Sequence, residues 1–405
     1  MRLIIYPIWA FALFLGLMVM ASAPAFATTA SNSPSQIVGG PDNPSDIFEF
    51  DGALYFNAET TPGDMGIWKY DGNQFSVISQ HIVMIPNSHV EFRGELYFAG
   101  YPFSGSSITD TKLYKATASG LSDPIAPMGF DEEALVVFND VLYFTGEHPT
   151  YIVQTFDGTN VGTASGFPCC LQRGVVSGNK LYFSGWHPPG SFDLYSFDGT
   201  TVTQHSTVSQ VPREIQVLNG SVYFVGVIDQ SINWDKAWFT PTSTSVAAIS
   251  LPFQPDTVPT VQFNNQIIIS KPNTNELYGF NGTGVELFSQ NYSGYGRMAA
   301  SPSFVYFEGI STTSNSQLYY SDGVMEAVIP NTEYSNGIAT MGTIGSLLYY
   351  FDNDNSQWWV FDPFKSTPQA QLAATGQQSV WLVMAMGFMT IGLAFVLMGR
   401  KPIRI

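Results

Sequence analysis

Two histidines and a pair of adjacent cysteines are the residues of this sequence best suited to bind a metal ion. His148 ends the segment Tyr-Phe-Thr-Gly-Glu-His, and His187 ends the closely similar segment Tyr-Phe-Ser-Gly-Trp-His. Cys169 and Cys170 lie between them in the sequence. Imidazole nitrogen and thiolate sulfur are the ligands that zinc and softer transition metals prefer. The pattern predicts a metal site built on His148 and His187. The alternative is two loop histidines and an unrelated cysteine pair.

The adjacent cysteines are also candidates for a disulfide between neighbours in the chain. Neighbouring Cα atoms are about 3.8 Å apart, whereas bridged cysteines usually have Cα atoms about 4.4–6.8 Å apart. A bridge between Cys169 and Cys170 would therefore close a strained ring. Two free thiols, or thiols that bond to another molecule, are the alternative. With two cysteines in 405 residues, the chain is not a disulfide scaffold.

No motif in the sequence predicts catalysis. A nucleophile elbow, an HExxH helix and a phosphate-binding glycine loop are all absent from the sequence. The segment Asp352–Asn355 comes nearest to a calcium loop, but it lacks the alternating carboxylates of an EF-hand and is interpreted as a polar turn. We therefore predict no catalytic residue and no cofactor.

The elements that position these residues are β-strands, as residues 134–163 illustrate. Leu135–Phe138 and Leu142–Phe144 are apolar and aromatic runs suited to a half-buried strand. A third strand is predicted at 152–156, followed by Asp157-Gly158, a hairpin turn that needs positive φ. The second of these strands carries the signature Leu-Tyr-Phe.

This signature recurs eight times, at steps of 38 to 46 residues. A period near forty with about four short strands is typical of a β-propeller blade. A small four-stranded sheet cannot bury both faces alone, but blades around an axis bury them against their neighbours. We predict an all-β propeller of eight four-stranded blades. Seven blades, or a β-sandwich array or solenoid, are the alternatives. The copies begin at Leu54, Leu96, Leu142, Leu181, Val222, Ile267, Val305 and Leu348.

The repeat resembles those of known secreted propellers. The third copy, Leu-Tyr-Phe-Thr-Gly followed by Thr-Phe-Asp-Gly-Thr, is similar to the ELWxTDGT-type repeat of bacterial secreted propellers and to a kelch-type blade. The double glycine of kelch blades is a single glycine here, as at Gly146 and Gly185. The resemblance covers about 46–370 and implies a propeller at a cell surface. It implies no particular activity.

Both ends of the chain predict export and membrane anchoring. Residues 1–27 have an apolar core and the small-residue pattern Ala25-Phe26-Ala27, which indicates a secretory signal peptide. Residues 380–398 are 19 uncharged residues, which span about 28 Å as a helix and so cross a bilayer. Basic residues in the tail 399–405 favour a cytoplasmic C-terminus. A processed sorting tail is the alternative to a permanent anchor.

The predicted organisation is therefore that of a single-pass type I membrane protein. A leader at 28–45 precedes the propeller at 46–370, and a polar stalk at 371–379 precedes the anchor. The net charge of −17 argues against nucleic acid as a partner. We expect a non-enzymatic propeller that recognises a protein or glycan. The alternatives are an exported lyase, hydrolase or oxidase with its site in the central funnel, and a structural surface component.

Overall fold

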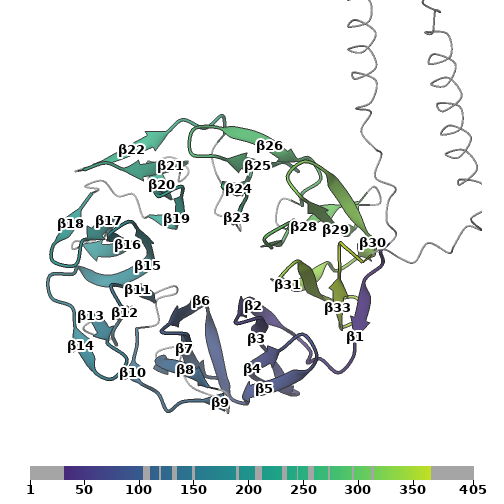
Figure 1. Cartoon of the computed structure of the whole chain (residues 1–405), viewed down its shortest axis with the longest axis horizontal. Coiled ribbons are helices and arrows are strands. Elements are labelled where there is room, and N and C mark those ends of the chain that lie inside the picture. Colours follow the sequence, from purple (N-terminus) through teal and green to yellow (C-terminus); the bar gives the residue numbers. More distant parts are fainter. Residues whose placement is uncertain are drawn as a thin grey trace, which may run out of the picture. The chain divides into compact units, whose positions relative to one another are not determined.

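The computed structural model describes residues 32–365 apart from 104–109, 118–119, 130–134, 148–150, 188–190, 206–211, 230–234, 244, 254–259, 272–273, 294–295 and 312–313. Within these residues, eight antiparallel sheets form the unit Ser33–Pro363. The sheets stand side by side around an axis, with the first strand of each blade innermost (Figure 1). The prediction of an all-β, eight-bladed propeller is confirmed, and the seven-bladed alternative is wrong.

The strands of each blade follow one another as a meander from the axis outward. In blade 2 the outer position is divided, because β9 and β10 both pair with β8. Blade 1 has β2 (Ser45–Phe50), β3 (Ala53–Thr61), β4 (Asp64–Tyr70) and β5 (Phe75–Ser79); blade 2 has β6 (Ile82–Phe92), β7 (Glu95–Pro102), β8 (Lys112–Thr117), β9 (Gly120–Leu121) and β10 (Ala126–Pro127); blade 3 has β11 (Val136–Phe138), β12 (Val141–Thr145), β13 (Val153–Phe156) and β14 (Val161–Thr163); blade 4 has β15 (Cys169–Ser177), β16 (Lys180–His187), β17 (Ser191–Phe197) and β18 (Val202–Gln204).

The second half of the ring repeats this order. Blade 5 has β19 (Arg213–Leu218), β20 (Ser221–Asp229), β21 (Asp235–Pro241) and β22 (Val246–Ile249); blade 6 has β23 (Val261–Phe263), β24 (Gln266–Ser270), β25 (Leu277–Phe280) and β26 (Val285–Ser289); blade 7 has β27 (Met298–Ala300), β28 (Val305–Ile310), β29 (Ser316–Ser321) and β30 (Glu326–Tyr334); blade 8 has β31 (Ile338–Ile344), β32 (Leu347–Asp352) and β33 (Gln357–Phe361), with β1 (Ser35–Ile37) as its outermost strand.

The ring is closed by a strand from the other end of the unit. β1 pairs antiparallel with β33, with Ser35 opposite Val360 and Ile37 opposite Trp358. This differs from the sequence analysis, which placed an irregular leader at 28–45. Three residues are too few for an alternating pattern to be recognised, and the strand that they pair with lies at the far end of the propeller sequence.

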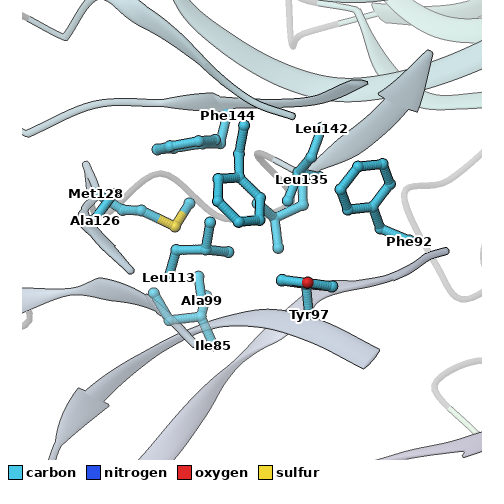
Figure 2. Close-up of a cluster of buried hydrophobic side chains, with 11 residues drawn as sticks. Ile85, Phe92, Tyr97, Ala99, Leu113, Ala126, Met128, Leu135, Leu142 and Phe144 are labelled. Atoms are coloured by element: carbon cyan, nitrogen blue, oxygen red, sulfur yellow. The ribbon is translucent and has the colours of Figure 1, made fainter. Parts of the chain in front are cut away.

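The Leu-Tyr-Phe signature builds the seams between blades. Side chains alternate between the two faces of a strand, so the outer two residues of a signature face one neighbouring blade and the central one faces the other. Tyr97 of blade 2 packs with Leu142 and Phe144 of blade 3. Figure 2 shows Leu142 and Phe144 on one side of this cluster, facing Tyr97 and Leu113 on the other. Each blade thus contributes a different face to each of its two seams.

The same arrangement recurs around the ring. At the closure, Tyr349 of blade 8 lies in one cluster with Leu54 and Phe56 of blade 1. The remaining seams join Tyr55 to Leu96 and Phe98, Tyr143 to Leu181 and Phe183, Tyr182 to Val222 and Phe224, Tyr223 to Ile267 and Ile269, Ile268 to Val305 and Phe307, and Tyr306 to Leu348 and Tyr350.

The predicted Asp-Gly hairpin turns are present. The Oδ1 atom of Asp157 accepts the backbone N–H groups of Thr159 and Asn160 at 2.8 and 2.7 Å, and Gly158 has φ of +94°. These N–H donors stabilise the carboxylate and lower the pKa of Asp157. The same pair of bonds is made at Asp71, Asp198, Asn281 and Asp322.

The predicted signal peptide at 1–27, stalk at 371–379, anchor at 380–398 and tail at 399–405 lie outside the described residues. Among the residues that are described, no helix combines the length and apolar character needed to cross a bilayer. Export and anchoring therefore stay predictions.

Candidate functional site

The structure does not describe the side chains of the two predicted metal ligands, His148 and His187. His148 lies outside the described residues, and His187 is described by its backbone at the end of β16. The register of β15 and β16 places Cys169 opposite Trp186, next to His187. The described part of the chain holds no group of three or more His, Cys, Asp or Glu residues that could bind a metal. The metal site on His148 and His187 remains a prediction.

The cysteine pair begins β15 with an irregular backbone. No disulfide joins Cys169 and Cys170 in the structure. Cys170 is buried, and its φ of +62° is in the left-handed region that favours glycine. Its backbone N–H donates to the Tyr151 carbonyl at 3.1 Å, and the register shifts between Cys169 and Leu171. The vicinal disulfide also remains a prediction.

The segment Asp352–Asn355 is a polar turn, as expected from the sequence. The carboxylate of Asp354 accepts the backbone N–H groups of Ser335 and Asn336 at 2.6 and 2.9 Å. Asp352 is fully buried, and its Oδ1 accepts the N–H of Asp354 at 2.7 Å. These carboxylates therefore organise the chain around them.

An open cavity lined by polar and apolar residues lies on the axial side of four consecutive blades. It has a volume of about 400 Å³ and is bordered by β6, β11, β15 and β19, together with Leu135, which precedes β11. These strands lie on the inside of the ring (Figure 1). The volume is within the range of about 300–1,000 Å³ found for small-molecule sites. The lining residues are Asn87, His89, Val90, Leu135, Val136, Val137, Arg173, Gly174, Val175, Val176, Glu214, Ile215 and Gln216.

The charged residues of this cavity share one position in the repeat. Arg173 and Glu214 each lie eight residues before the first residue of the signature in their blade, as does Asp46 in blade 1. All three have positive φ, of +48°, +49° and +55°. Each also lies at a shift in the register between the first and second strands. Such a bulge redirects a side chain that would otherwise follow the alternation of the strand.

This conformation has an energetic cost. A side chain other than glycine in the left-handed region costs on the order of 1 kcal/mol per residue, and strained backbone of this kind clusters at binding and catalytic sites. Asn87, which also lines the cavity, has φ of +55°. Three strained polar residues, Asn87, Arg173 and Glu214, therefore border the same cavity.

Arg173 and Glu214 form an ion pair between blades 4 and 5. The Nη1 atom of Arg173 is 2.9 Å from Oε1 of Glu214, and their side chains are 22% and 28% exposed. Arg297, at the same repeat position in blade 7, donates from Nε to the Ile338 carbonyl of blade 8 at 3.1 Å. The position thus links neighbouring blades. Arg173 and Glu214 also line the cavity, whereas Arg297 does not.

His89 occupies a place that other blades fill with apolar side chains. His89 directly precedes Val90, which pairs with the signature tyrosine Tyr97. Leu135 in blade 3 and Ile215 in blade 5 have the equivalent position. The His89 ring stacks on Phe48 of blade 1, with centroids 3.5 Å apart and planes 8° from parallel. Burial against this apolar surface disfavours the charged imidazolium and lowers the pKa of His89 to about 4.

We expect His89 to make stability depend on pH. Between pH 4 and 6.5 the unfolded chain binds a proton at this histidine that the folded chain does not, so stability rises with pH across this window. The contribution is complete above pH 6.5 and is lost as the pH falls through 4. It amounts to at most about 3.5 kcal/mol, because the pKa is lowered by about 2.5 units and one unit corresponds to about 1.4 kcal/mol.

The measurement is urea denaturation from pH 4.5 to 7.5 on the native chain and on the His89→Leu variant. The variant should have a flatter profile, with the largest gain in stability at the acid end. His81→Gln serves as the control, because the His81 side chain is 62% exposed. Parallel profiles for the native and His89→Leu chains would contradict the assignment.

Among the described residues of the cavity wall, the charges balance and hydrogen-bonding groups are present. Arg173 and Glu214 have opposite charges, and His89 is neutral above its lowered pKa. The amides of Asn87 and Gln216 offer both donors and acceptors; Gln216 itself donates to Thr260 of blade 6. The lining residues include no Ser, Thr, Cys, Lys or Tyr, so the described wall offers no side-chain nucleophile of these types.

The sequence analysis did not predict this site, although a signal for it is present. Aligning the copies on Leu-Tyr-Phe places Asp46, Arg173, Glu214 and Arg297 at a common offset of eight residues. At two of these four residues, Arg173 and Glu214, the position borders the axial cavity. The stronger likeness between copies lies in the loops that follow the signature, and those loops contain His148 and His187.

Comparisons with known proteins support the fold. Comparison with protein-family models gives no match, and comparison with curated proteins gives none either. Among solved structures, the chain is similar to a prolyl endopeptidase, with a TM-score of 0.51 and 13% identity over 78% of this chain. A puromycin hydrolase gives a TM-score of 0.48 and 11% identity over 79% of this chain.

The chain spans 55% of the length of the prolyl endopeptidase and 59% of the puromycin hydrolase. The β-propeller domain of the Trilobed protease from Pyrococcus furiosus, which has an open velcro topology, is covered over 99% of its length, with 72% of this chain, 11% identity and a TM-score of 0.46. At these identities the similarity concerns the fold alone.

Proposed function

We propose that this protein is a membrane-anchored, extracytoplasmic recognition propeller that binds part of a protein or glycan in its axial cavity. The observation that carries the proposal is the placement of Arg173 and Glu214. They come from different blades, share one strained conformation, and meet at 2.9 Å on the wall of the cavity. Strained backbone clusters at functional sites. Because it is present at the same repeat position in two neighbouring blades, we infer that this polar surface is organised for binding.

The place of action in this proposal follows from the ends of the sequence. The signal peptide at 1–27 directs the propeller out of the cytoplasm, and the segment 380–398 anchors it as a type I membrane protein. The likeness of the repeat to kelch-type and ELWxTDGT-type blades supports a surface role. The acidic balance of the chain disfavours nucleic acid as its ligand.

An exported enzyme with its site in the same cavity is the second candidate. Its support is the convergence of ionisable residues at the axis, namely His89, Arg173 and Glu214. A neutral imidazole and a carboxylate are groups that transfer protons in catalysis. Recognition is favoured because the carboxylate is already paired with the guanidinium, and because the described lining supplies none of the usual hydroxyl, thiol or amine nucleophiles.

The experiment that tests this function measures binding and turnover together. The purified full-length chain is mixed with a defined panel of peptides and oligosaccharides, and ligand NMR spectra are followed over a day. The proposal expects a ligand that binds, that is recovered unchanged, and that binds at least tenfold more weakly to Glu214→Gln, the loss expected for one charge-assisted hydrogen bond.

Arg297→Gln is the matched control, because Arg297 has the same repeat position but does not line the cavity. Its affinity for the ligand should equal that of the native chain. Cleavage or oxidation of the ligand would favour the enzyme instead. Protease digestion of intact cells tests the location, and a propeller protected from added protease would contradict a surface role.

A further inference from the structure

We infer that the ligand of the axial cavity is a neutral, hydroxyl-rich ring, and specifically one pyranose unit at the end of a glycan. This inference rests on the proposed recognition function and selects between its two ligand classes. It follows from the size of the cavity, the balance of its charges, and the combination of polar and apolar side chains on its wall.

The size of the cavity favours a small unit over a folded protein surface. A stable protein interface buries about 800 Å² on each partner, which requires a broad face. The space here is about 400 Å³ and is bordered by the inner strands of four blades, near the lower end of the range of about 300–1,000 Å³ for small-molecule sites. A terminal sugar that projects from a larger molecule fits such a site.

The charges of the wall favour a neutral ligand. Arg173 and Glu214 are mostly buried, each less than a third exposed, and they satisfy each other at 2.9 Å. The pair is neutral as a whole, so it offers no net charge to a carboxylate or ammonium ligand, and burying such an ion without a counter-charge is unfavourable. A hydroxyl both donates and accepts. It can therefore bond to the carboxylate and to the guanidinium while the pair stays together.

The remaining lining has the two kinds of surface that a pyranose presents. The Gln216 amide donates from Nε2 to Thr260 and accepts at Oε1 from Gln262, which leaves one donor hydrogen and one lone pair for a ring hydroxyl. The valines of the wall offer an apolar surface instead, and Val176 is 39% exposed. Apolar side chains in contact with the C–H face of a ring remove both surfaces from water. The valines of the wall are Val90, Val136, Val137, Val175 and Val176.

The test compares sugars that share one ring and differ in charge. Glucose, galactose, mannose and N-acetylglucosamine are the neutral probes, glucuronate is the anionic probe and glucosamine the cationic probe. Binding to the full-length chain is measured by calorimetry and saturation-transfer NMR. We expect at least one neutral sugar to bind, and glucuronate and glucosamine to bind at least about tenfold more weakly than that sugar.

Glu214→Gln provides a test that does not depend on loss of folding. The substitution keeps the shape but removes the negative charge that holds Arg173. The wall then carries a positive charge that Glu214 no longer balances, which favours an anionic ligand, so glucuronate should gain at least about tenfold relative to the neutral sugar. Arg297→Gln, the matched control, should keep the native order of affinities.

The inference is overturned by equal binding of neutral and charged sugars, by an unchanged order of affinities in Glu214→Gln, or by no sugar binding at about 10 mM. If no sugar binds but a peptide does so in a Glu214-dependent manner, this inference fails while the recognition function stands. If a bound sugar is cleaved or oxidised, the ligand class stands and the non-enzymatic function fails.

Discussion

Replacing Trp358 with alanine is expected to reduce the free energy of unfolding by about 3–5 kcal/mol, the usual cost of removing a large aromatic side chain from a core. Trp358 is 2% exposed and lies between blade 8 and blade 1. Its ring is 4.9 Å from that of Phe56 and 5.5 Å from that of Phe75, centroid to centroid. Its Nε1–H donates to the Pro41 carbonyl at 2.9 Å. The residue therefore fixes the N-terminal segment to the last blade.

The measurement is urea denaturation, with small-angle scattering on the folded chain to detect an opened ring. Trp358→Phe separates packing from hydrogen bonding. It should lose about 1–2 kcal/mol, because most of the buried ring is kept. Val324→Ala is the surface control, since Val324 is 91% exposed, and should change stability by less than about 0.5 kcal/mol. A Trp358→Ala chain as stable as the native one would show that closure does not depend on this side chain.

Phe144→Ala is expected to cost a similar amount, about 3–5 kcal/mol, at the seam between blades 2 and 3. Phe144 is fully buried in the cluster that joins blade 2 to blade 3. The same cluster holds Leu113, Met128 and Tyr97 (Figure 2). Deletion of the ring leaves a cavity between two sheets that are each fixed by another neighbour, so the site can collapse little.

Val161→Ala is the matched control for this seam, because Val161 lies on the outermost strand of the same blade and is 43% exposed. Its cost should stay below about 0.5 kcal/mol. The free energies come from denaturation curves with a common slope. A cost for Phe144→Ala near that of Val161→Ala would mean that the signature does not hold the seams together.

The seams could be predicted from the sequence because their cause is local and repeated. A three-residue pattern such as Leu142–Phe144 contains both faces of one strand, and eight copies at similar steps define the number of blades. Turn chemistry was equally local. Asp157-Gly158 requires positive φ at glycine, and the structure has it.

Two features could not be predicted for physical reasons. β1 is three residues long, and its identity depends on a partner at the other end of the propeller. The axial site depends on left-handed backbone at Arg173 and Glu214, a conformation that the preferences of these residue types disfavour. Tertiary structure imposes that conformation, so only the common offset from the signature could have indicated it.

The pairing of β1 with β33 also determines the order in which the molecule can be completed. Trp358 and Pro41, which meet at the closure, are 317 residues apart in the chain. On a ribosome, blades 1 to 7 can each acquire their strands as they emerge, whereas β1 must wait without a partner until translation reaches β33. During that interval the nascent protein carries an unpaired strand and, at the end, a bare sheet edge that can pair with other chains. The last bonds formed in synthesis are therefore those that protect the finished protein from aggregation.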